Sequence, residues 1–321
     1  MKNILDNNKI TIDVIIPLFY PNNSIKILIF SLLSQSYKIN KIIIINSGAT
    51  NKINNFLHFV VEKNDNIIMR KFNKLNPGEA RNIGINLSNA KYLAFFDVNT
   101  FLELDWIEKN LITINSLPDK VLYGQRITLA NTFVKNINKW STYGEAPYMA
   151  LTGTLIEASF LKKNKLFFKS PRAGEDIEWI ARTNKFNLYR PKYSTQIYYN
   201  GIFDSFLKTM KKWFNYSFAY ANIKKDINHQ KKLFFLTSLY LIFCSYFLIK
   251  INIYLLIFFI MLNLLFYFIY FSIIRPLKKK VKFSMLFPFN WLLVGMYRFC
   301  LDLAKFPGLL YGQLKIFFRK D

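Results

Sequence analysis

The stretch PGEARNIGINLSNAKYLAFFDVN, residues 77–99, joins a helix pattern to a strand pattern. Pro77 and Gly78 precede small and apolar residues at helical spacing, which indicates a helix that starts at the proline. These residues are Ala80, Ile83, Gly84 and Leu87. Tyr92–Phe96 then forms a short, continuous apolar run, which is typical of a strand buried on both faces. A helix followed at once by such a strand indicates a sheet with helices on both faces.

The same alternation extends from Ile12 to about Asn200. Three further apolar runs predict buried strands, at Ile12–Pro17, Lys41–Ile45 and Ile67–Lys71. Ser24 is placed to cap a helix whose apolar residues share one face, namely Ile25, Leu28, Ile29, Leu32 and Leu33. We therefore predict an α/β fold with a mostly parallel sheet. Ligands of such sheets bind at the carboxyl ends of the strands, here residues 17–22, 46–51 and 97–101.

Composition narrows the functional class. The 321 residues are 52% hydrophobic, which excludes a disordered or collagen-like chain. Lysine and arginine number 44 against 19 acidic residues, and the net charge of +25 favours an anionic partner: nucleic acid, a phosphorylated substrate or an acidic membrane surface. The two cysteines, Cys244 and Cys300, have no metal-binding spacing, so we expect neither a disulfide scaffold nor a zinc module.

Two long apolar runs near the C-terminus predict a membrane hairpin. Leu233–Ile249 and Ile251–Ile274 carry no charge, and Lys250 separates them. Lysine and arginine flank the pair on both sides, so both flanks should be cytosolic. These residues are Lys224, Lys225, Lys231, Lys232, Arg275, Lys278, Lys279, Lys280 and Lys282. The N-terminus lacks the pattern of a signal peptide, and we expect the front of the chain in the cytosol too.

Two segments beside the hairpin are amphipathic. Phe203–Tyr220 mixes aromatic residues with lysines, and Phe283–Phe318 has polar residues between apolar turns. Either segment can lie in the membrane interface, against anionic headgroups, or pack on the globular domain. A membrane surface would account for much of the positive charge. Since no RNA-recognition, helix-turn-helix or zinc-finger pattern is present, we expect no nucleic-acid partner.

Two acidic motifs could carry chemistry. Asp97 and Asn99 follow a buried strand and, two residues apart, point the same way, so they could hold a hard divalent cation beside a diphosphate. They could equally cap the next turn. Glu175 and Asp176 follow Gly174 at the start of a helical pattern, where an acid serves either as a general base or as a helix cap.

The third motif is the glycine-led helix start Gly78-Glu79-Ala80-Arg81-Asn82-Ile83-Gly84. Its arginine could bind a phosphate or a structural carboxylate. The glycine spacing matches neither a Walker loop nor a dinucleotide fingerprint.

In order and spacing, these motifs resemble those of family 2 glycosyltransferases of the GT-A fold, over about residues 12–200. The family's opening strand ending in I-P corresponds to Val14–Tyr20, and its S-L-x-x-Q-x-Y helix to Ser31–Tyr37. Its D-[DS]-G-S-T-D, G-x-A-R-N-x-G, D-x-D and G-E-D motifs correspond to Asn46–Asn51, Gly78–Gly84, Asp97–Asn99 and Gly174–Asp176.

The resemblance implies a role for each motif. A nucleotide-sugar donor would bind against Pro17, Asn46, Gly48, Arg81 and Asp97. Asp97 and Asn99 would hold Mg²⁺ or Mn²⁺ at its diphosphate. Asp176 would be the general base that deprotonates the acceptor hydroxyl, inverting the sugar linkage, and Glu175 would orient the site or contact the acceptor.

Three positions depart from the family pattern. Asn46 and Asn99 replace aspartates, and residues 196–200 lack the histidine that many relatives carry near the metal. These neutral replacements leave open weaker metal dependence, another donor, or a catalytically degenerate relative that binds saccharides or scaffolds a membrane complex.

The resemblance and the apolar runs together divide the chain into four parts. We expect a GT-A domain at 1–202, a basic juxtamembrane segment at 203–232, a transmembrane hairpin at 233–274 and an interfacial tail at 275–321. The expected protein is a bacterial glycosyltransferase at the cytosolic side of the inner membrane. Its acceptor would be a lipid-linked saccharide of envelope polysaccharide or lipopolysaccharide assembly.

Overall fold

The chain forms two compact units. The computed structural model describes residues 10–19, 23–48, 50–116, 121–169, 174–186, 196–203, 205–221, 242, 245–246 and 253–317. One unit comprises Met1–Leu129 and Pro147–Gly201, and the other comprises Ala130–Ala146 and Ile202–Asp321. The division predicted from the sequence placed 130–146 in the domain at 1–202 and split 203–321 into three parts, whereas segment 130–146 and Ile202–Asp321 belong to one unit here. Segment 130–146 joins the second unit because Ile137 and Trp140 pack in that unit's core.

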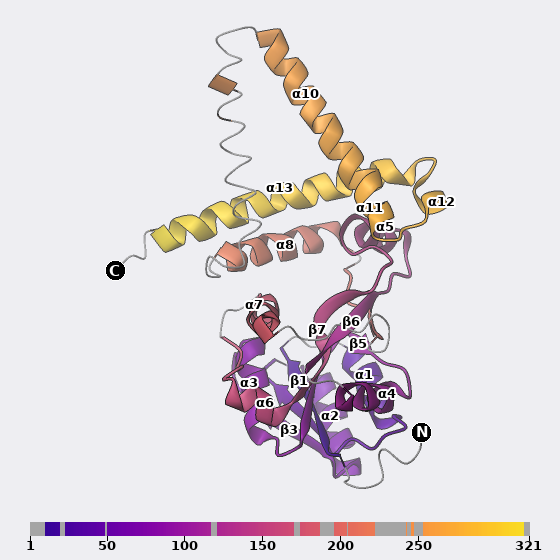
Figure 1. The fold of residues 1–321 in the computed structure, drawn as a ribbon, viewed down its shortest axis with the longest axis vertical. Helices are drawn as coiled ribbons and strands as arrows, with labels where there is room; N and C mark the ends of the chain where they lie inside the picture. Colours follow the sequence, from indigo (N-terminus) through magenta and orange to yellow (C-terminus); the bar gives the residue numbers. More distant parts are fainter. Residues whose placement is uncertain are drawn as a thin grey trace. The chain divides into compact units, whose positions relative to one another are not determined.

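The first unit is built on one mixed sheet (Figure 1). Its described strands are β1 (Ile12–Leu18), β2 (Lys41–Asn46), β3 (Ile67–Lys71), β4 (Tyr92–Phe95), β5 (Thr100–Phe101), β6 (Val121–Thr128), β7 (Tyr148–Glu157) and β8 (Gln196–Tyr199). They form an eight-stranded sheet in the order β3-β2-β1-β4-β7-β6-β8-β5.

The first four strands of the sheet are parallel, and the strand order reverses beside β1. β2 and β3 extend the sheet on one side of β1, whereas β4 pairs with its other side. The carboxyl ends of β1 and β4 therefore lie at a topological switch point, where ligands of such sheets bind. Pairing of β1 with β4 ends at Ile15, so Pro17, which has no N–H to donate, faces a neighbouring strand on the β2 side alone.

Helices cover both faces of the sheet. On one face α1 (Ser24–Leu33), α2 (Asn51–Lys63) and α4 (Trp106–Asn115) bury their apolar residues against the even-numbered residues of β1. On the other face lie α3 (Pro77–Leu87), α6 (Ala158–Lys163) and α7 (Glu175–Thr183). β1 and β2 are buried from both sides, which explains their unbroken apolar sequences.

The predicted strands and helices of the first unit are confirmed, with differences in detail. The four predicted strands end within one residue of their expected bounds. Ser24 is the first residue of α1 rather than its cap, and the cap position is Asn23. Leu33 is 37% exposed because it lies at the edge of the buried face. The antiparallel strands β6 and β7 were not predicted.

The second unit is helical. Its described helices are α5 (Phe133–Thr142), α8 (Phe206–Ala221), α10 (Ile253–Ile269), a π-helical turn (Tyr270–Ile274), α11 (Arg275–Lys278), α12 (Phe283–Leu286) and α13 (Asn290–Phe317). α8 runs along α13, and α10 leaves the end of α13 where α11 lies (Figure 1). α8 and α13 approach closely at Gly308 of α13, where an added Cβ would lie 2.5 Å from the carbonyl oxygen of Phe214 in α8.

Within the described residues, one helix is long and apolar enough to cross a membrane. It spans Ile253–Lys278, and only 6% of its most apolar stretch of 18 residues is buried. This helix coincides with the second predicted span. The first, Leu233–Ile249, lies outside the described residues except for Ile242, Ser245 and Tyr246, so the hairpin stays a prediction.

The aromatic face of α8, one candidate for the membrane interface, packs on α13 instead. Phe206 contacts Tyr297 at 5.0 Å between ring centroids, and Phe218 stacks on Tyr311 at 5.4 Å. The side chains that α8 exposes include Leu207, Lys208 and Lys211. Packing against a neighbouring helix therefore accounts for the amphipathic pattern of this segment.

Gly84 allows α3 to lie against β1, and an alanine there should destabilise the protein. Its Cβ would come within 2.5 Å of the side chain of Ile15. We expect Gly84→Ala to cost about 1–3 kcal/mol through overpacking, although alanine is the better helix former by about 1 kcal/mol. The melting temperature should fall on the order of 5 °C.

Asn86→Ala is the matched control, since Asn86 is exposed on the same helix. Its melting temperature should stay level or rise slightly. Equal behaviour of the two variants would show that α3 does not depend on close contact with β1.

Candidate active site

A buried arginine connects the three sequence motifs. Arg81 of α3 donates from Nη2 to Oδ1 of Asp97 at 2.8 Å and from Nη1 to Oε1 of Glu175 at 2.9 Å. The arginine side chain is 4% exposed and that of Glu175 is 8% exposed, whereas Asp97 is 36% exposed. One guanidinium thus holds the end of β4 and the start of α7 together.

The surroundings of Arg81 keep it charged. Burial acts to lower the pKa of the guanidinium, but Coulomb attraction to Asp97 and Glu175 outweighs burial and raises it. The guanidinium lies over the ring of Phe168, 5.3 Å from its centroid. Because both terminal nitrogens bind carboxylates, Arg81 positions these acids.

In the Gly78–Gly84 motif, Gly78 and Asn82 are explained by their contacts with residues 168 and 169. At Gly78 an added Cβ would lie 2.6 Å from the carbonyl oxygen of Lys169, so a larger residue would push α3 from this loop. Asn82 clamps the backbone of Phe168, donating to its carbonyl and accepting from its N–H, both at 2.8 Å. The motif therefore fixes the segment before α7, which carries the two acids.

Glu175 and Asp176 differ in accessibility. Gly174 precedes them with φ +83°, a left-handed conformation that favours glycine and turns the chain into α7. Glu175 is 6% exposed and bound to Arg81, whereas Asp176 is half-buried and accepts the backbone N–H of Ile177 at 2.8 Å. Asp176 thus keeps more exposed residue surface than Glu175 and is not bound to Arg81 by a hydrogen bond.

Burial raises the pKa of both acids. For Glu175, burial is the largest cause, opposed by Arg81 and reinforced by repulsion from Asp176. For Asp176, burial again leads, opposed by Arg81 and reinforced by Asp97. A carboxylate whose pKa is raised is a stronger base than a free aspartate.

Asp97 and Asn99 lie in the turn that follows β4. The N–H of Asp97 donates to the hydroxyl of Thr152 at 3.1 Å, and its carbonyl accepts the hydroxyl of Thr100 at 2.5 Å. The carbonyl of Asn99 accepts the N–H of Asn200 at 2.9 Å, at the end of β8. Hydrogen bonds to Thr152 of β7 and to Asn200 at the end of β8 therefore fix the position of this turn.

The predicted donor residues Pro17, Asn46 and Gly48 lie at the ends of β1 and β2. Asn46 is 1% exposed, and its side chain donates to Oδ1 of Asn54 at 2.7 Å and accepts the N–H of Gly48 at 3.3 Å. An added Cβ at Gly48 would lie 2.1 Å from the carbonyl oxygen of Phe19. Through these bonds Asn46 shapes the loop after β2.

Sequence reasoning missed Arg126, which lies on β6. Its guanidinium sits between two rings, 4.3 Å from the centroid of Tyr199 and 4.7 Å from that of Tyr148, and Nε donates to the Tyr148 hydroxyl. The charge of Arg126 lowers the pKa of Asp176, which places it within electrostatic reach of that carboxylate. No motif marks this arginine, because β6 pairing brings it to the site.

The charges in this site are compatible with a divalent cation. Asp97, Glu175 and Asp176 against Arg81 and Arg126 leave one excess negative charge when all are ionised, which would repel a diphosphate. A cation at Asp97 and Asn99 would reverse that sign. Within the described residues no group of three or more His, Cys, Asp or Glu side chains could hold a metal, so water and phosphate oxygens would supply the other ligands of a cation at Asp97.

Comparison with known proteins identifies the family that the motifs resemble. The family model described as Glycosyl transferase family 2 matches residues 13–195, more than half of the chain. An uncharacterized glycosyltransferase of Rickettsia bellii is 32% identical over 200 residues, covering 57% of this chain and 28% of the relative. One of Haemophilus influenzae is 31% identical over 102 residues, covering 31% and 40%. The chain thus spans less than a third of the first relative's length.

Among solved structures, the crystal structure of S. aureus TarS residues 1–349 aligns with a TM-score of 0.48. The sequences are 14% identical, and the alignment covers 68% of each chain.

Replacement of Arg81 tests how much its two ion pairs contribute to the stability of the first unit. We expect Arg81→Met to destabilise the first unit by about 3–5 kcal/mol, because Glu175 and Asp97 lose the cation that compensates their charge. Thermal unfolding of the purified chain measures this loss.

Arg70→Met removes an exposed arginine from β3 and should leave the melting temperature nearly unchanged. If both variants melt alike, the bridge contributes little to stability.

Proposed function

The chain belongs to glycosyl transferase family 2, and on that premise we propose that it moves a sugar from a nucleotide donor to an acceptor hydroxyl, inverting the anomeric centre. The observation that supports this proposal is the half-buried Asp176, whose pKa is raised by burial and which lies within electrostatic reach of Asp97 and Arg81. The bridge from Arg81 to Glu175 keeps the start of α7 in place, so that the neighbouring carboxylate has a defined position.

Asp176 would act as the general base. It would accept the proton of the acceptor hydroxyl while the hydroxyl oxygen attacks the anomeric carbon and the bond to the nucleotide diphosphate breaks. Burial favours this step, because the raised pKa strengthens the base. Arg81, and to a smaller extent Arg126, oppose burial by lowering the pKa of Asp176 and so favour the ionised form that a base needs.

The donor's diphosphate would lie by the turn after β4. Asp97 and Asn99 would hold Mg²⁺ or Mn²⁺ there, and a bound cation would stabilise the charge that develops on the departing diphosphate. The loop held by Asn46 and Gly48 at the end of β2 would receive the nucleoside.

We further propose that the protein works at the cytosolic face of a membrane. The apolar helix Ile253–Lys278 is long enough to span a bilayer of about 30 Å, and Lys278, Lys279, Lys280 and Lys282 gather at its end, which favours the cytosol there. The chain passes between the two units three times, so the first unit is held to this anchor. An acceptor carried on a lipid, as in envelope polysaccharide assembly, would be confined to the same surface.

Replacement of the base tests the proposal. Detergent-purified protein is incubated with UDP-, GDP- and dTDP-sugars, a membrane lipid extract, and either Mn²⁺ or EDTA. We expect nucleotide release from one donor, loss of release in EDTA, and a fall of about 10²- to 10⁴-fold in Asp176→Asn.

The same variant should not be less stable. Between the usual pKa of an aspartate and the raised pKa of Asp176, the folded protein binds more protons than the unfolded chain, so its stability falls as the pH rises through that window. At neutral pH the asparagine removes this cost, and the melting temperature should equal or exceed that of the wild type. Asp65→Asn, at an exposed turn, is the control for both measurements. Failure of every donor in the wild type, with one nucleotide still raising its melting temperature, would instead favour a degenerate binding protein.

The influence of Arg126 predicts a shift in the pH profile. Because Arg126 lowers the pKa of Asp176, its loss should move the acid limb of the kcat profile to higher pH. We expect this shift in Arg126→Gln, and no shift in Arg70→Gln, which alters an exposed arginine of β3. An unchanged acid limb with lower kcat would limit Arg126 to holding the substrate.

A further inference from the structure

The second unit contains a cluster of cations around one carboxylate, which we call the cation cluster. Its members are Arg275, Lys279, Arg298 and Lys305 around Asp302. Oδ2 of Asp302 accepts from Nε of Arg298 at 2.7 Å and from the hydroxyl of Tyr267 at 2.6 Å. Its Oδ1 accepts from Nζ of Lys305 at 2.7 Å. Both carboxylate oxygens of Asp302 thus have hydrogen-bond partners. The four cations exceed this one negative charge by three.

The end of α5 offsets a small part of this excess. Arg275 donates to the carbonyl of Ser141 at 3.2 Å, and Lys279 donates to that of Thr142, which are the last two residues of the helix. The negative end of a helix dipole corresponds to roughly half a charge. Glu145, also in this region, is bound to Lys139 and to the indole of Trp140. Between two and three positive charges, about 2.5, are therefore left uncompensated.

The cations repel one another. Burial and, after it, repulsion from Arg298 lower the pKa of Lys305 to about 8, against the attraction of Asp302. Burial, followed by repulsion from Arg275, Arg298 and Lys305, lowers the pKa of Lys279 to about 8. A salt-bridge network built for stability would balance its charges, since unpaired buried charge is costly. Among the residues that the structure describes, Asp302 is the acidic side chain that binds these cations, and it does not balance their charge.

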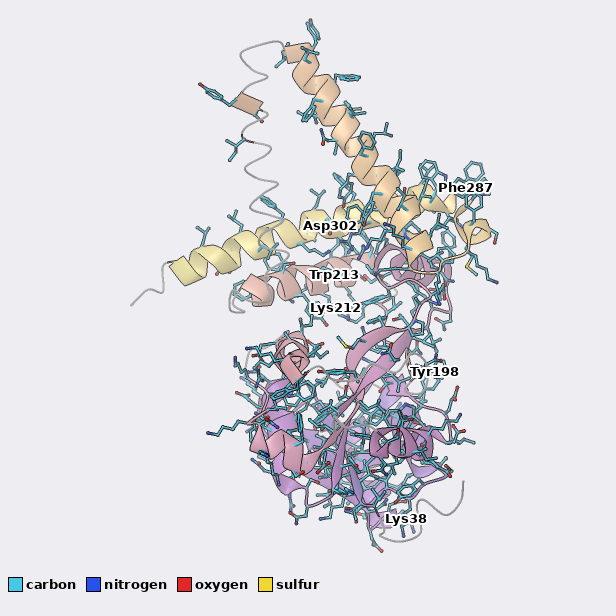
Figure 2. All side chains as sticks on the ribbon, in the orientation of Figure 1. Lys38, Tyr198, Lys212, Trp213, Phe287 and Asp302 are labelled. Atoms are coloured by element: carbon cyan, nitrogen blue, oxygen red, sulfur yellow. The ribbon has the colours of Figure 1, made fainter. Side chains whose placement is uncertain are left out.

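Aromatic rings contact the cluster. It lies where α10 meets α11 and α13, and Figure 2 shows Asp302 on α13 with Trp213 on the neighbouring α8. Lys305 lies 4.3 Å from the ring centroid of Trp213, and Arg298 lies 4.9 Å from that of Phe271. α13 exposes a continuous apolar stripe at helical spacing: Met296, Phe299, Leu303, Phe306, Leu310 and Leu314. An anion that arrives here would fit best if an apolar chain carried it.

We propose that the cation cluster binds the phosphate group of a lipid that carries at least two negative charges, a lipid diphosphate or phosphomonoester. A phosphodiester headgroup, with one charge, would leave the cluster cationic. The proposal rests on the proposed function in one respect, because a lipid diphosphate is the chemistry of a lipid-carried acceptor. The cluster would hold that carrier in the second unit, where none of the residues proposed for catalysis lies.

The test measures ligand-induced melting shifts of the full chain in detergent. The probes are farnesyl diphosphate, farnesol, pyrophosphate and phosphatidylglycerol. We expect farnesyl diphosphate to raise the melting temperature more than the other three, because it supplies both the charge and the chain. Lys305→Gln and Lys279→Gln should weaken its binding at least tenfold. Lys282→Gln removes an exposed lysine three residues after Lys279 and should bind as the wild type does.

Without ligand, the melting temperature of Lys305→Gln should be no lower than that of the wild type, because burial of the charged lysine costs stability. A lower melting temperature with unchanged lipid binding would make the cluster structural and overturn the proposal. Equal shifts with farnesol or with phosphatidylglycerol would also overturn it, the latter in favour of a phospholipid headgroup.

Asp176→Asn separates this proposal from the enzymatic one. The variant should lose nucleotide release yet keep the farnesyl diphosphate shift. A wild type that releases nucleotide but shows no shift would refute the lipid site and leave the transferase assignment standing.

Discussion

The first unit depends on the guanidinium of Arg81. Its two terminal nitrogens bind acids that lie 16 and 94 residues away in the chain, one after β4 and one at the start of α7. Helix α3 delivers the arginine, and α3 can approach because Gly78 and Gly84 leave room for Lys169 and Ile15. A single buried cation therefore converts three separate segments into one site. Replacement by lysine would not preserve this, since one ammonium cannot reach both acids in the fixed fork geometry of arginine.

The sequence was informative where a local pattern controls the structure. The buried strands β1, β2 and β4 appear as apolar runs, and Gly78–Gly84, Asp97 and Glu175 stand in order along the chain. The prediction of a buried strand at Ile67–Lys71 was wrong in burial, because β3 is the edge strand and buries only Ile67. Its limits were long-range contacts. Arg126 carries no local signal, since β6 pairing and the rings of Tyr148 and Tyr199 bring it to Asp176. The apolar pattern of α8 left two interpretations open, a membrane interface or packing, and contacts with a second amphipathic helix, α13, account for part of it.

Asn46 and Asn99 show how far a residue type determines a role. As neutral replacements for aspartates, both suggested a weakened site. The structure gives Asn46 a buried position in which its amide both donates and accepts, bonds that an aspartate could make only in part. For Asn99 the argument is electrostatic: with three acids already close to the turn, another carboxylate would add repulsion unless a metal were bound. A neutral amide there makes cation binding more dependent on the phosphates of the donor.

The two units carry opposite charge imbalances, and both lower stability. Around Asp97, Glu175 and Asp176 acids are in excess, and the pKa values of Glu175 and Asp176 are raised. Around Asp302 cations are in excess, and the pKa values of Lys279 and Lys305 are lowered. In each case the shift moves the group toward its neutral form, as expected of a charge that its surroundings do not fully compensate. Local rules of stable folding are broken most often where a protein binds a ligand. A divalent cation would reverse the sign of the first imbalance and so favour a diphosphate, and a lipid phosphate would offset the second, so both ends of a transfer reaction at a membrane would be held by charges that the folded chain leaves unsatisfied.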